Sequence, residues 1–217
     1  MSTLKAGRIL VLNGAPRSGK STLVRLIQER LPGVWINLGV DMHNERMLPP
    51  RYRPGLGLRP GGERVDLEPL LPRLFAALYE SMAAHSRAGL DVVADLGHHD
   101  DHSTPLGILP DCARRLAGLP AWLIGLHAPI ETILARRAAS DPQLYLSTTA
   151  DGSVPPSVLR WQDAVHRPGL YDLTLDTSRL SPEACLARIE SALATPSFGP
   201  KGDTSDGTRA FERLAAS

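Results

Sequence analysis

Residues 14–22 have the types and the spacing of a loop that binds phosphate groups. Gly14, Gly19, Lys20 and Ser21 match the pattern G-x-x-x-x-G-K-[ST], and an apolar run over 9–12 precedes them. A helix expected over 20–31 follows, so backbone N–H groups and the positive end of a helix dipole converge on an anion. In such a loop the lysine reaches the β- and γ-phosphates, and the serine hydroxyl binds Mg²⁺. We therefore expect a nucleoside triphosphate to be bound by Gly14, Ala15, Pro16, Arg17, Ser18, Gly19, Lys20, Ser21 and Thr22, with Arg17 either on phosphate or in solvent.

Two aspartates follow predicted strands on the side of the sheet where ligands bind, beyond the carboxyl ends of the strands. Asp95 ends the apolar strand expected over 90–94, which is the position of a carboxylate that holds Mg²⁺ directly or through its water. An aspartate at a strand end can also cap a helix. Asp41 follows a strand expected over 34–38, where a carboxylate beside the γ-phosphate can take the proton of an attacking hydroxyl. A loop aspartate or a second Mg²⁺ contact are the alternatives for Asp41.

A phosphoryl group in transfer is stabilised by nearby positive charge. Arg136 and Arg137 lie on a helix expected over 130–139 that leads into a loop over 141–156. We expect one of the two to reach the transferring group, although an arginine pair on a helix is also typical of a solvated face.

A polar cluster over 98–102, His-His-Asp-Asp-His, follows Asp95. A metal site is one interpretation, but no distant cysteine or histidine completes a ligand set. We favour a loop whose side chains hydrogen-bond a polar substrate. Trp161 and His166, on a helix expected over 157–165, are interpreted as packing residues.

Strand-like and helix-like segments alternate along the chain, which predicts a parallel sheet of five strands covered by helices. Strands are expected over 8–13, 34–38, 90–94, 121–126 and 173–175, and further helices over 67–88, 110–116 and 181–194. The proline- and glycine-rich stretch 48–62 cannot form a regular helix. From residue 195 the composition predicts a flexible tail over 195–217, within which 208–215 could form a short helix.

The composition excludes several classes of protein. A chain of 217 residues suffices for one α/β domain, and its net charge of +1 gives no electrostatic footprint for nucleic acid. Cys112 and Cys185 form neither a disulfide framework nor a zinc pattern. No run approaches the roughly 18 apolar residues of a membrane span. We expect a cytoplasmic protein without nucleic-acid or membrane partners, and leave open whether it forms a homo-oligomer.

The sequence resembles the chloramphenicol phosphotransferase family, P-loop kinases with a fold like that of nucleotide and shikimate kinases. The resemblance covers roughly residues 8–192. It rests on Ile9-Leu10-Val11-Leu12-Asn13-Gly14 before Gly19-Lys20-Ser21, on Trp35-Ile36-Asn37-Leu38-Gly39-Val40-Asp41, on Ala88-Gly89-Leu90-Asp91-Val92-Val93-Ala94-Asp95, and on Val165-His166 with Tyr171-Asp172-Leu173-Thr174-Leu175-Asp176-Thr177.

The resemblance implies an ATP-dependent phosphotransferase with a hydroxyl acceptor, which requires Mg²⁺. It implies that Asp41 is the catalytic base and that Asp176 and Thr177 lie near the adenine pocket. One domain over 1–194 is then expected, with acceptor-site loops over 48–66 and 96–110 and a lid over 136–156.

Three departures from the family pattern concern the acceptor and the lid. The lid lacks the Gly-Asp-Arg of the family. After Asp95 the chain reads Leu96-Gly97-His98-His99, where the family has a second acid and apolar residues. The segment 48–62 is more basic than in the family, because it carries Arg51, Arg53 and Arg59. The acceptor is therefore expected to be more polar than chloramphenicol, such as another antibiotic. A metabolic kinase acting on a sugar acid, nucleoside or shikimate-like acid is the alternative, and a nucleotide-switched binding protein is a third.

Overall fold

Five parallel strands form one sheet in the computed structural model, which describes residues 5–53, 64–140, 153–154, 156–195 and 209–216. The strands are β1 (Ile9–Asn13), β2 (Trp35–Asn37), β3 (Asp91–Leu96), β4 (Ala121–His127) and β5 (Leu173–Asp176). Their order is β2-β3-β1-β4-β5, so the strand that precedes the phosphate-binding loop lies in the centre. Leu12 of β1 is in register with Asp95 of β3 and Ile124 of β4. The predicted five-stranded parallel sheet is confirmed.

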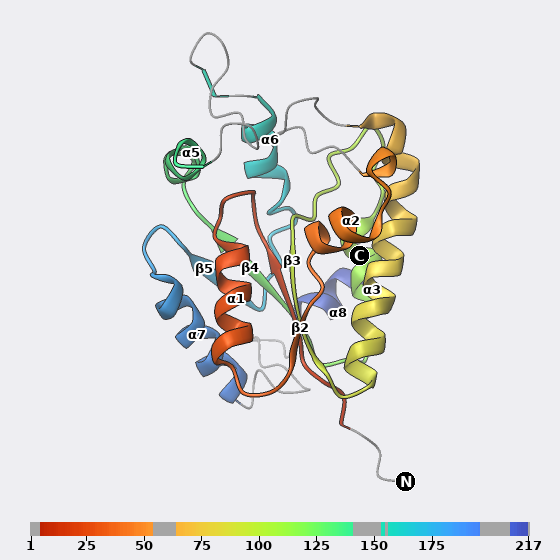
Figure 1. Cartoon of the computed structure of the whole chain (residues 1–217), viewed down its shortest axis with the longest axis vertical. Helices are drawn as coiled ribbons and strands as arrows, with labels where there is room; N and C mark the ends of the chain where they lie inside the picture. The colour runs from red at the N-terminus through yellow and green to blue at the C-terminus, as the bar shows by residue number, and fades with distance from the viewer. Residues whose placement is uncertain (1–4, 54–63, 141–152, 155, 196–208, 217) are drawn as a thin grey trace.

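Helices cover both faces of this sheet (Figure 1). One face carries α1 (Lys20–Arg30) and α7 (Pro182–Ala194), and the other carries α3 (Leu71–Arg87), α4 (Ile108–Arg115) and α8 (Ala210–Ala215). Side chains of a strand alternate between the faces. Leu10 accordingly joins the apolar cluster of Ile27, whereas Val11 joins the cluster of Met82.

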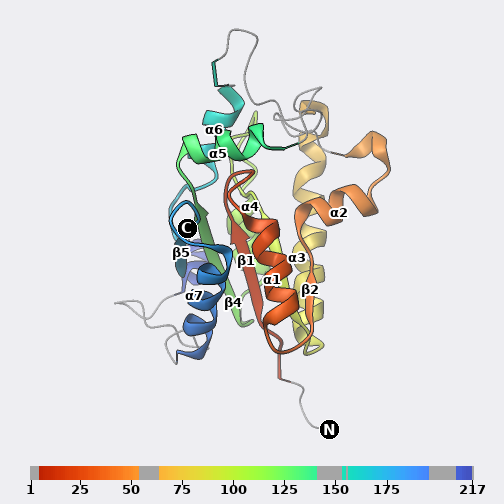
Figure 2. The ribbon, with the colours of Figure 1, turned by 60° about the vertical axis from the view of Figure 1, so that its left-hand side comes forward.

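Further short elements lie near the carboxyl ends of the strands. Helix α2 (Val40–Met47) follows β2, and α5 (Ile130–Ala138) and α6 (Pro156–Ala164) lie beyond the ends of the central strands (Figure 2). Two 3₁₀ turns, η1 (Pro50–Tyr52) and η2 (Val65–Leu70), precede α3. Within the described residues no helix is long and apolar enough to cross a bilayer.

Two helices differ from the sequence-based expectation. The helix expected over 67–88 is divided into η2 and α3, with Pro72 in the first turn of α3 and Pro69 inside η2. Gly89, at φ 82°, follows its end. Helix α2 was not predicted, because it has eight residues without an apolar period and runs into Pro49 and Pro50.

The short helix that the sequence allowed over 208–215 is present as α8, and residues 209–216 pack against the domain instead of belonging to a flexible tail. Helix α8 buries Phe211 and Leu214 in the cluster that covers one face of the sheet. The Asp172 carboxylate accepts a hydrogen bond from the N–H of Ala210 at 2.9 Å, which satisfies a donor at the start of this helix. Burial of two large apolar side chains therefore outweighs the polar composition that precedes them.

Candidate active site

The loop between β1 and α1 has the geometry of a phosphate cradle. Gly19 lies at φ 97° and Arg17 at φ 71°, which turns the chain sharply before the helix begins. A Cβ on Gly14 would lie 2.5 Å from the carbonyl oxygen of Leu126, so only glycine fits there. Seven of the nine predicted loop residues line a cavity, and the other two, Ala15 and Ser18, are buried beneath it.

Lys20 lies over this loop. Its Nζ donates hydrogen bonds to the carbonyl oxygens of Gly14 at 2.7 Å and Ala15 at 3.0 Å. Burial lowers the pKa of Lys20 to about 8, against the opposing attraction of Asp95 and then Asp41. The lysine is therefore in the field of both predicted site carboxylates, and a bound polyphosphate would favour its charged form.

Ser21 and Asp95 form a pair of oxygen groups beside Lys20. The Ser21 hydroxyl donates to Asp95 Oδ2 at 2.7 Å. The backbone of Gly39 abuts the other carboxylate oxygen, because a Cβ there would lie 1.9 Å from Oδ1. A hydroxyl and a carboxylate are hard ligands of the kind that Mg²⁺ prefers, with phosphate and water completing its shell. Within the described residues no group of three His, Cys, Asp or Glu side chains could hold a metal, whereas the Ser21 hydroxyl and the Asp95 carboxylate are oxygen donors of the type that fits Mg²⁺.

Asp41 lies in the first turn of α2 and lines the same cavity as Lys20 and Asp95. The prediction that Asp41 ends the second strand without a helix after it is wrong, because Gly39 is extended and a helix begins at Val40. Negative charge is favoured at the N-terminus of a helix, and the side chain of Asp41 is exposed. The residue can therefore present a carboxylate to a molecule in the cavity.

The two predicted lid arginines have different surroundings. Arg136 donates to the carbonyl oxygen of Arg17 at 3.1 Å, to Thr177 Oγ1 at 3.0 Å and to the carbonyl oxygen of Thr177 at 2.6 Å, and it lines the cavity. Arg137 is 1% exposed and is not among the lining residues. Arg136 is therefore the arginine that the fold brings to the phosphate-binding loop. Most of the predicted lid, residues 141–152 and 155, lies outside the described residues.

Thr177 and Asp176 also differ in their placement. Thr177, which follows β5, donates from its Oγ1 to the carbonyl oxygen of Ser18 at 2.8 Å. This hydrogen bond connects the end of β5 to the phosphate-binding loop. The Asp176 carboxylate accepts from the N–H of Ser178 at 2.9 Å and does not line the cavity. Thr177 is thus the member of the predicted pair that lines the cavity.

One cavity of about 610 Å³ includes both sides of the phosphate-binding loop. Thr177, Pro182 and Cys185 line it on one side of the loop. On the other side it is lined by the residues that follow η1 and precede η2 and by residues of η2, α3, the loop after β3, α4 and α6, namely Arg53, Arg64, Glu68, Leu71, Phe75, His99, His102, Ile108 and Trp161. The volume is within the range of pockets that bind small molecules.

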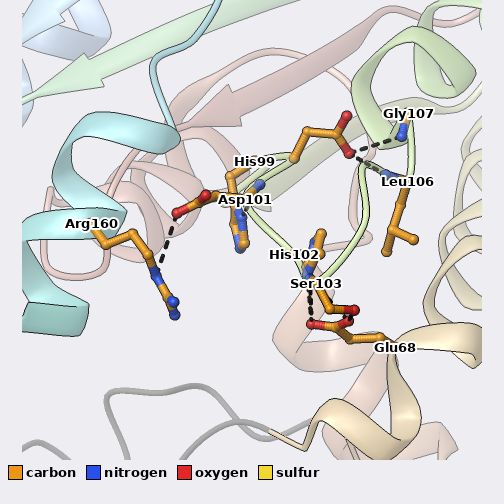
Figure 3. Close-up of polar contacts among 9 residues, drawn as sticks. Glu68, His99, Asp101, His102, Ser103, Leu106, Gly107 and Arg160 are labelled. Atoms are coloured by element: carbon orange, nitrogen blue, oxygen red, sulfur yellow. Dashed lines mark hydrogen bonds and ion pairs between the residues drawn. The ribbon is translucent and has the colours of Figure 1, made fainter.

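The loop 97–107, called here the acceptor loop, is held at its tip by contacts in several directions (Figure 3). Glu68 accepts hydrogen bonds from the N–H and the hydroxyl of Ser103, and its Oε1 lies 3.7 Å from His102 Nδ1. Asp101 lies 3.5 Å from Arg160 of α6. The acceptor loop therefore joins η2 to α6 across the cavity.

Of the histidines in the predicted polar cluster, two line the cavity and one does not. His99 stacks on His102 with ring centroids 4.4 Å apart and meets Trp161 edge-on at 4.2 Å. His98 points into the core, where its Nε2 bonds the hydroxyl of Tyr79, and burial lowers its pKa to about 3. The prediction that this cluster forms a polar pocket wall thus applies to His99 and His102 alone.

Several wall residues were not anticipated from the sequence. Glu68 and Phe75 line the cavity, and so does Trp161, which was interpreted as a packing residue; Arg64 also lines it and lies within the predicted acceptor-site loop 48–66. Of the two predicted basic residues that the structure describes, Arg53 lines it and Arg51 lies over the ring of Tyr52, while Arg59 lies outside the described residues. The spacing of Leu71 and Phe75 on one face of α3 is the signal that could have pointed to this wall.

Comparison with known proteins is consistent with this geometry. The family model described as chloramphenicol phosphotransferase-like protein matches residues 7–194. A protein of Mycobacterium tuberculosis (strain ATCC 25618 / H37Rv), provisionally named O-phosphotransferase Rv2636, is 26% identical over 193 residues, 82% of this chain and 78% of that protein.

Solved structures share the fold. A sugar kinase from Janibacter sp. HTCC2649 aligns with a TM-score of 0.57 at 20% identity, covering 89% of this chain and 96% of that one. Shikimate kinase from Aquifex aeolicus aligns with a TM-score of 0.54 at 14% identity, covering 85% and 95%. The fold is thus that of P-loop kinases.

Proposed function

The chain belongs to the chloramphenicol phosphotransferase-like family, and from that premise we propose that it transfers the γ-phosphoryl group of ATP to a hydroxyl of a small molecule. The observation that carries the proposal is the meeting of Lys20, Asp95 and Asp41 around one cavity that extends past the phosphate-binding loop. A protein that only senses nucleotide needs no carboxylate base beside the phosphates and no second compartment.

The residues divide the chemistry among them. The loop 14–22 and Lys20 would hold the phosphates, and Ser21 and Asp95 would hold Mg²⁺, which neutralises charge on the β- and γ-oxygens when bound. Asp41 accepts the proton of the acceptor hydroxyl while that oxygen bonds the γ-phosphorus. The bond from the γ-phosphorus to the bridging oxygen breaks, and ADP leaves with that oxygen. Catalysis of this kind consists mostly of positioning and charge stabilisation.

Arg136 would contribute positive charge at the nucleotide. Its guanidinium bonds the backbone of Arg17 and Thr177, so it is held beside the phosphate-binding loop. Thr177 would lie against the nucleotide from β5.

The acceptor is proposed to be a polar antibiotic. Its compartment combines aromatic surface from Phe75 and Trp161 with polar groups from Glu68, His99 and His102. A metabolic acid is the second candidate, because Arg53 and Arg64 both line the compartment, although Arg64 is also paired with Asp66 at 2.5 Å.

The Asp41→Asn variant tests the proposal. It keeps the size of the side chain but removes the base, so we expect unchanged affinity for an ATP analogue and a loss of acceptor-dependent ADP release by about 10²–10⁴-fold. Asp163→Asn is the matched control, since Asp163 is an exposed aspartate of α6 that pairs with Arg167 away from the cavity. The acceptors to be screened are antibiotics, sugar acids and nucleosides, with an added phosphate detected by mass spectrometry.

Two outcomes would contradict the proposal. Unchanged turnover in Asp41→Asn would remove the base assignment. Absence of ADP release with every acceptor, together with tight nucleotide binding, would favour the nucleotide-switched binding protein.

A further inference from the structure

A buried amide lies at the end of β1, directly before the phosphate-binding loop. Asn13 is 0% exposed. Its Nδ2 donates to the carbonyl oxygen of Val165 at 2.8 Å and to the hydroxyl of Tyr171 at 3.2 Å, and its Oδ1 accepts from the N–H of His98 at 2.8 Å. Because the N–H of His98 can only donate and the carbonyl of Val165 can only accept, the orientation of the amide is determined.

The partners of Asn13 belong to both walls of the acceptor compartment. His98 stands at the start of the acceptor loop, which carries His99 and His102 into the cavity. Val165 follows α6, the helix that carries Trp161. The side chain of Asn13 therefore links the end of β1 to two segments that are 85 and 152 residues away in sequence.

The two walls also touch each other close to the phosphate-binding loop. A Cβ on Gly97 would lie 3.1 Å from Cζ3 of Trp161 and 3.6 Å from the carbonyl oxygen of Gly14. A displacement of the acceptor loop, of α6 or of Gly14 therefore displaces the other two. Close packing of this kind transmits displacement rather than absorbing it.

The tip and the base of the acceptor loop are held by different kinds of contact. At the tip, Asp101 and Arg160 are each more than a third exposed, and ion pairs in such surroundings contribute little. At the base, the amide of Asn13 is fully buried, and loss of one partner would leave a buried polar group unsatisfied. Asn13 is therefore the stronger determinant of where the loop starts.

We propose that Asn13 is a positioning residue that couples the nucleotide site to the acceptor site. Asn13 does not line the cavity. Through its three hydrogen bonds, ordering of the phosphate-binding loop by nucleotide also orders the acceptor loop and the end of α6. The inference rests on the proposed function for its consequence in catalysis, but the coupling itself can be observed without an acceptor.

The test compares Asn13→Asp with the wild-type protein. An ionised carboxylate still accepts from the N–H of His98 and can accept from the Tyr171 hydroxyl, but it cannot donate to the carbonyl of Val165, so the direct link to the end of α6 is broken and the link to the loop is kept. Hydrogen exchange is measured with and without Mg²⁺ and a non-hydrolysable ATP analogue. In the wild-type protein we expect the analogue to slow exchange in 97–107 and in 156–171.

In Asn13→Asp we expect the analogue to bind with unchanged affinity and to slow exchange in 97–107 but no longer in 156–171. Tyr171→Phe removes one of the three hydrogen bonds and should lose part of the same protection, which gives a measurement if Asn13→Asp does not fold. A side chain that only stabilised the fold would lower the melting temperature and leave the protection pattern unchanged. With an acceptor identified, kcat should fall by about 10–100-fold while KM for ATP is kept.

The proposal is overturned if the analogue protects 156–171 equally in wild type and Asn13→Asp, or if it protects neither wall in the wild type. Failure of every acceptor in the phosphotransfer screen would contradict the proposed function and leave the exchange result standing. The two failures are therefore distinguishable.

Discussion

Replacement of Gly39 by alanine should displace the carboxylate that is proposed to hold magnesium. Gly39 lies at φ −65° and ψ 154°, a conformation that alanine adopts without strain. The added Cβ would nevertheless lie 1.9 Å from Asp95 Oδ1, where real contacts do not fall below 3.0 Å, so the carboxylate or the backbone must move by about 1 Å. Movement of Asp95 would break its 2.7 Å hydrogen bond with Ser21.

The expected loss follows from this displacement. A misplacement of about 1 Å in a catalytic arrangement costs about 10²-fold in rate, which corresponds to about 2.7 kcal/mol of transition-state stabilisation. Because the phosphate-binding loop itself is untouched, metal-free binding of a fluorescent ADP analogue should be unchanged. The concentration of Mg²⁺ needed for half-maximal binding of the ATP analogue should rise.

The assay is a titration of Mg²⁺ against a fluorescent ATP analogue, followed by phosphotransfer once an acceptor is found. Met42→Ala is the control, since this residue is half-exposed on α2, which follows Gly39, and does not line the cavity. A Gly39→Ala protein with the Mg²⁺ dependence and the rate of the wild type would refute the reasoning, because it would show that Asp95 is not constrained by Gly39 or does not serve the metal.

Two further predictions concern stability. Phe211→Ala should lower the free energy of unfolding by about 3–5 kcal/mol in urea denaturation, because its ring is 5% exposed in the cluster beneath α8. A loss as small as that of Val34→Ala, a change at a side chain 62% exposed, would show that α8 does not pack there. Below pH 6.5 the unfolded chain protonates His98 while the folded protein, in which burial lowers its pKa to about 3, does not. Stability should therefore fall with acidification by up to about 1.4 kcal/mol per pH unit, and His98→Gln should flatten that slope; equal slopes would contradict the burial of a neutral histidine.

The donor half of the site could be predicted from the sequence because its chemistry is local. A single contiguous segment contains Gly14, Gly19 and Lys20. The apolar run before Asp95 predicts the end of a strand. The position of Asp41 after β2 was recognised, although its helix was not. Short helices without an apolar period leave little trace in a sequence.

The acceptor half depends on pairings between distant residues. Glu68 and Ser103 are 35 residues apart, and Asp101 and Arg160 belong to different elements. Such partnerships follow from the packing of η2, the acceptor loop and α6, and no local pattern encodes them. A single sequence therefore indicates that 97–107 is polar without indicating what it binds.

The choice between the two arginines of α5 was decided by helix phase. Ile133 is 2% exposed, and Arg137 lies four residues later on the same buried face, whereas Arg136 is turned about 100° away. The sequence did contain this signal. The prediction did not use it and left open which of the two arginines reaches the transferring group; the hydrocarbon stem of an arginine can be buried.

The position of α8 has a consequence for biosynthesis. The apolar face that Phe211 and Leu214 cover includes residues of β4 and α4, which leave the ribosome some ninety residues earlier. At about 5–20 residues per second, a nascent chain would carry this face uncovered for several seconds. The uncovered apolar face would be a binding surface for a ribosome-associated chaperone. In a chain released before residue 210 this face would stay exposed.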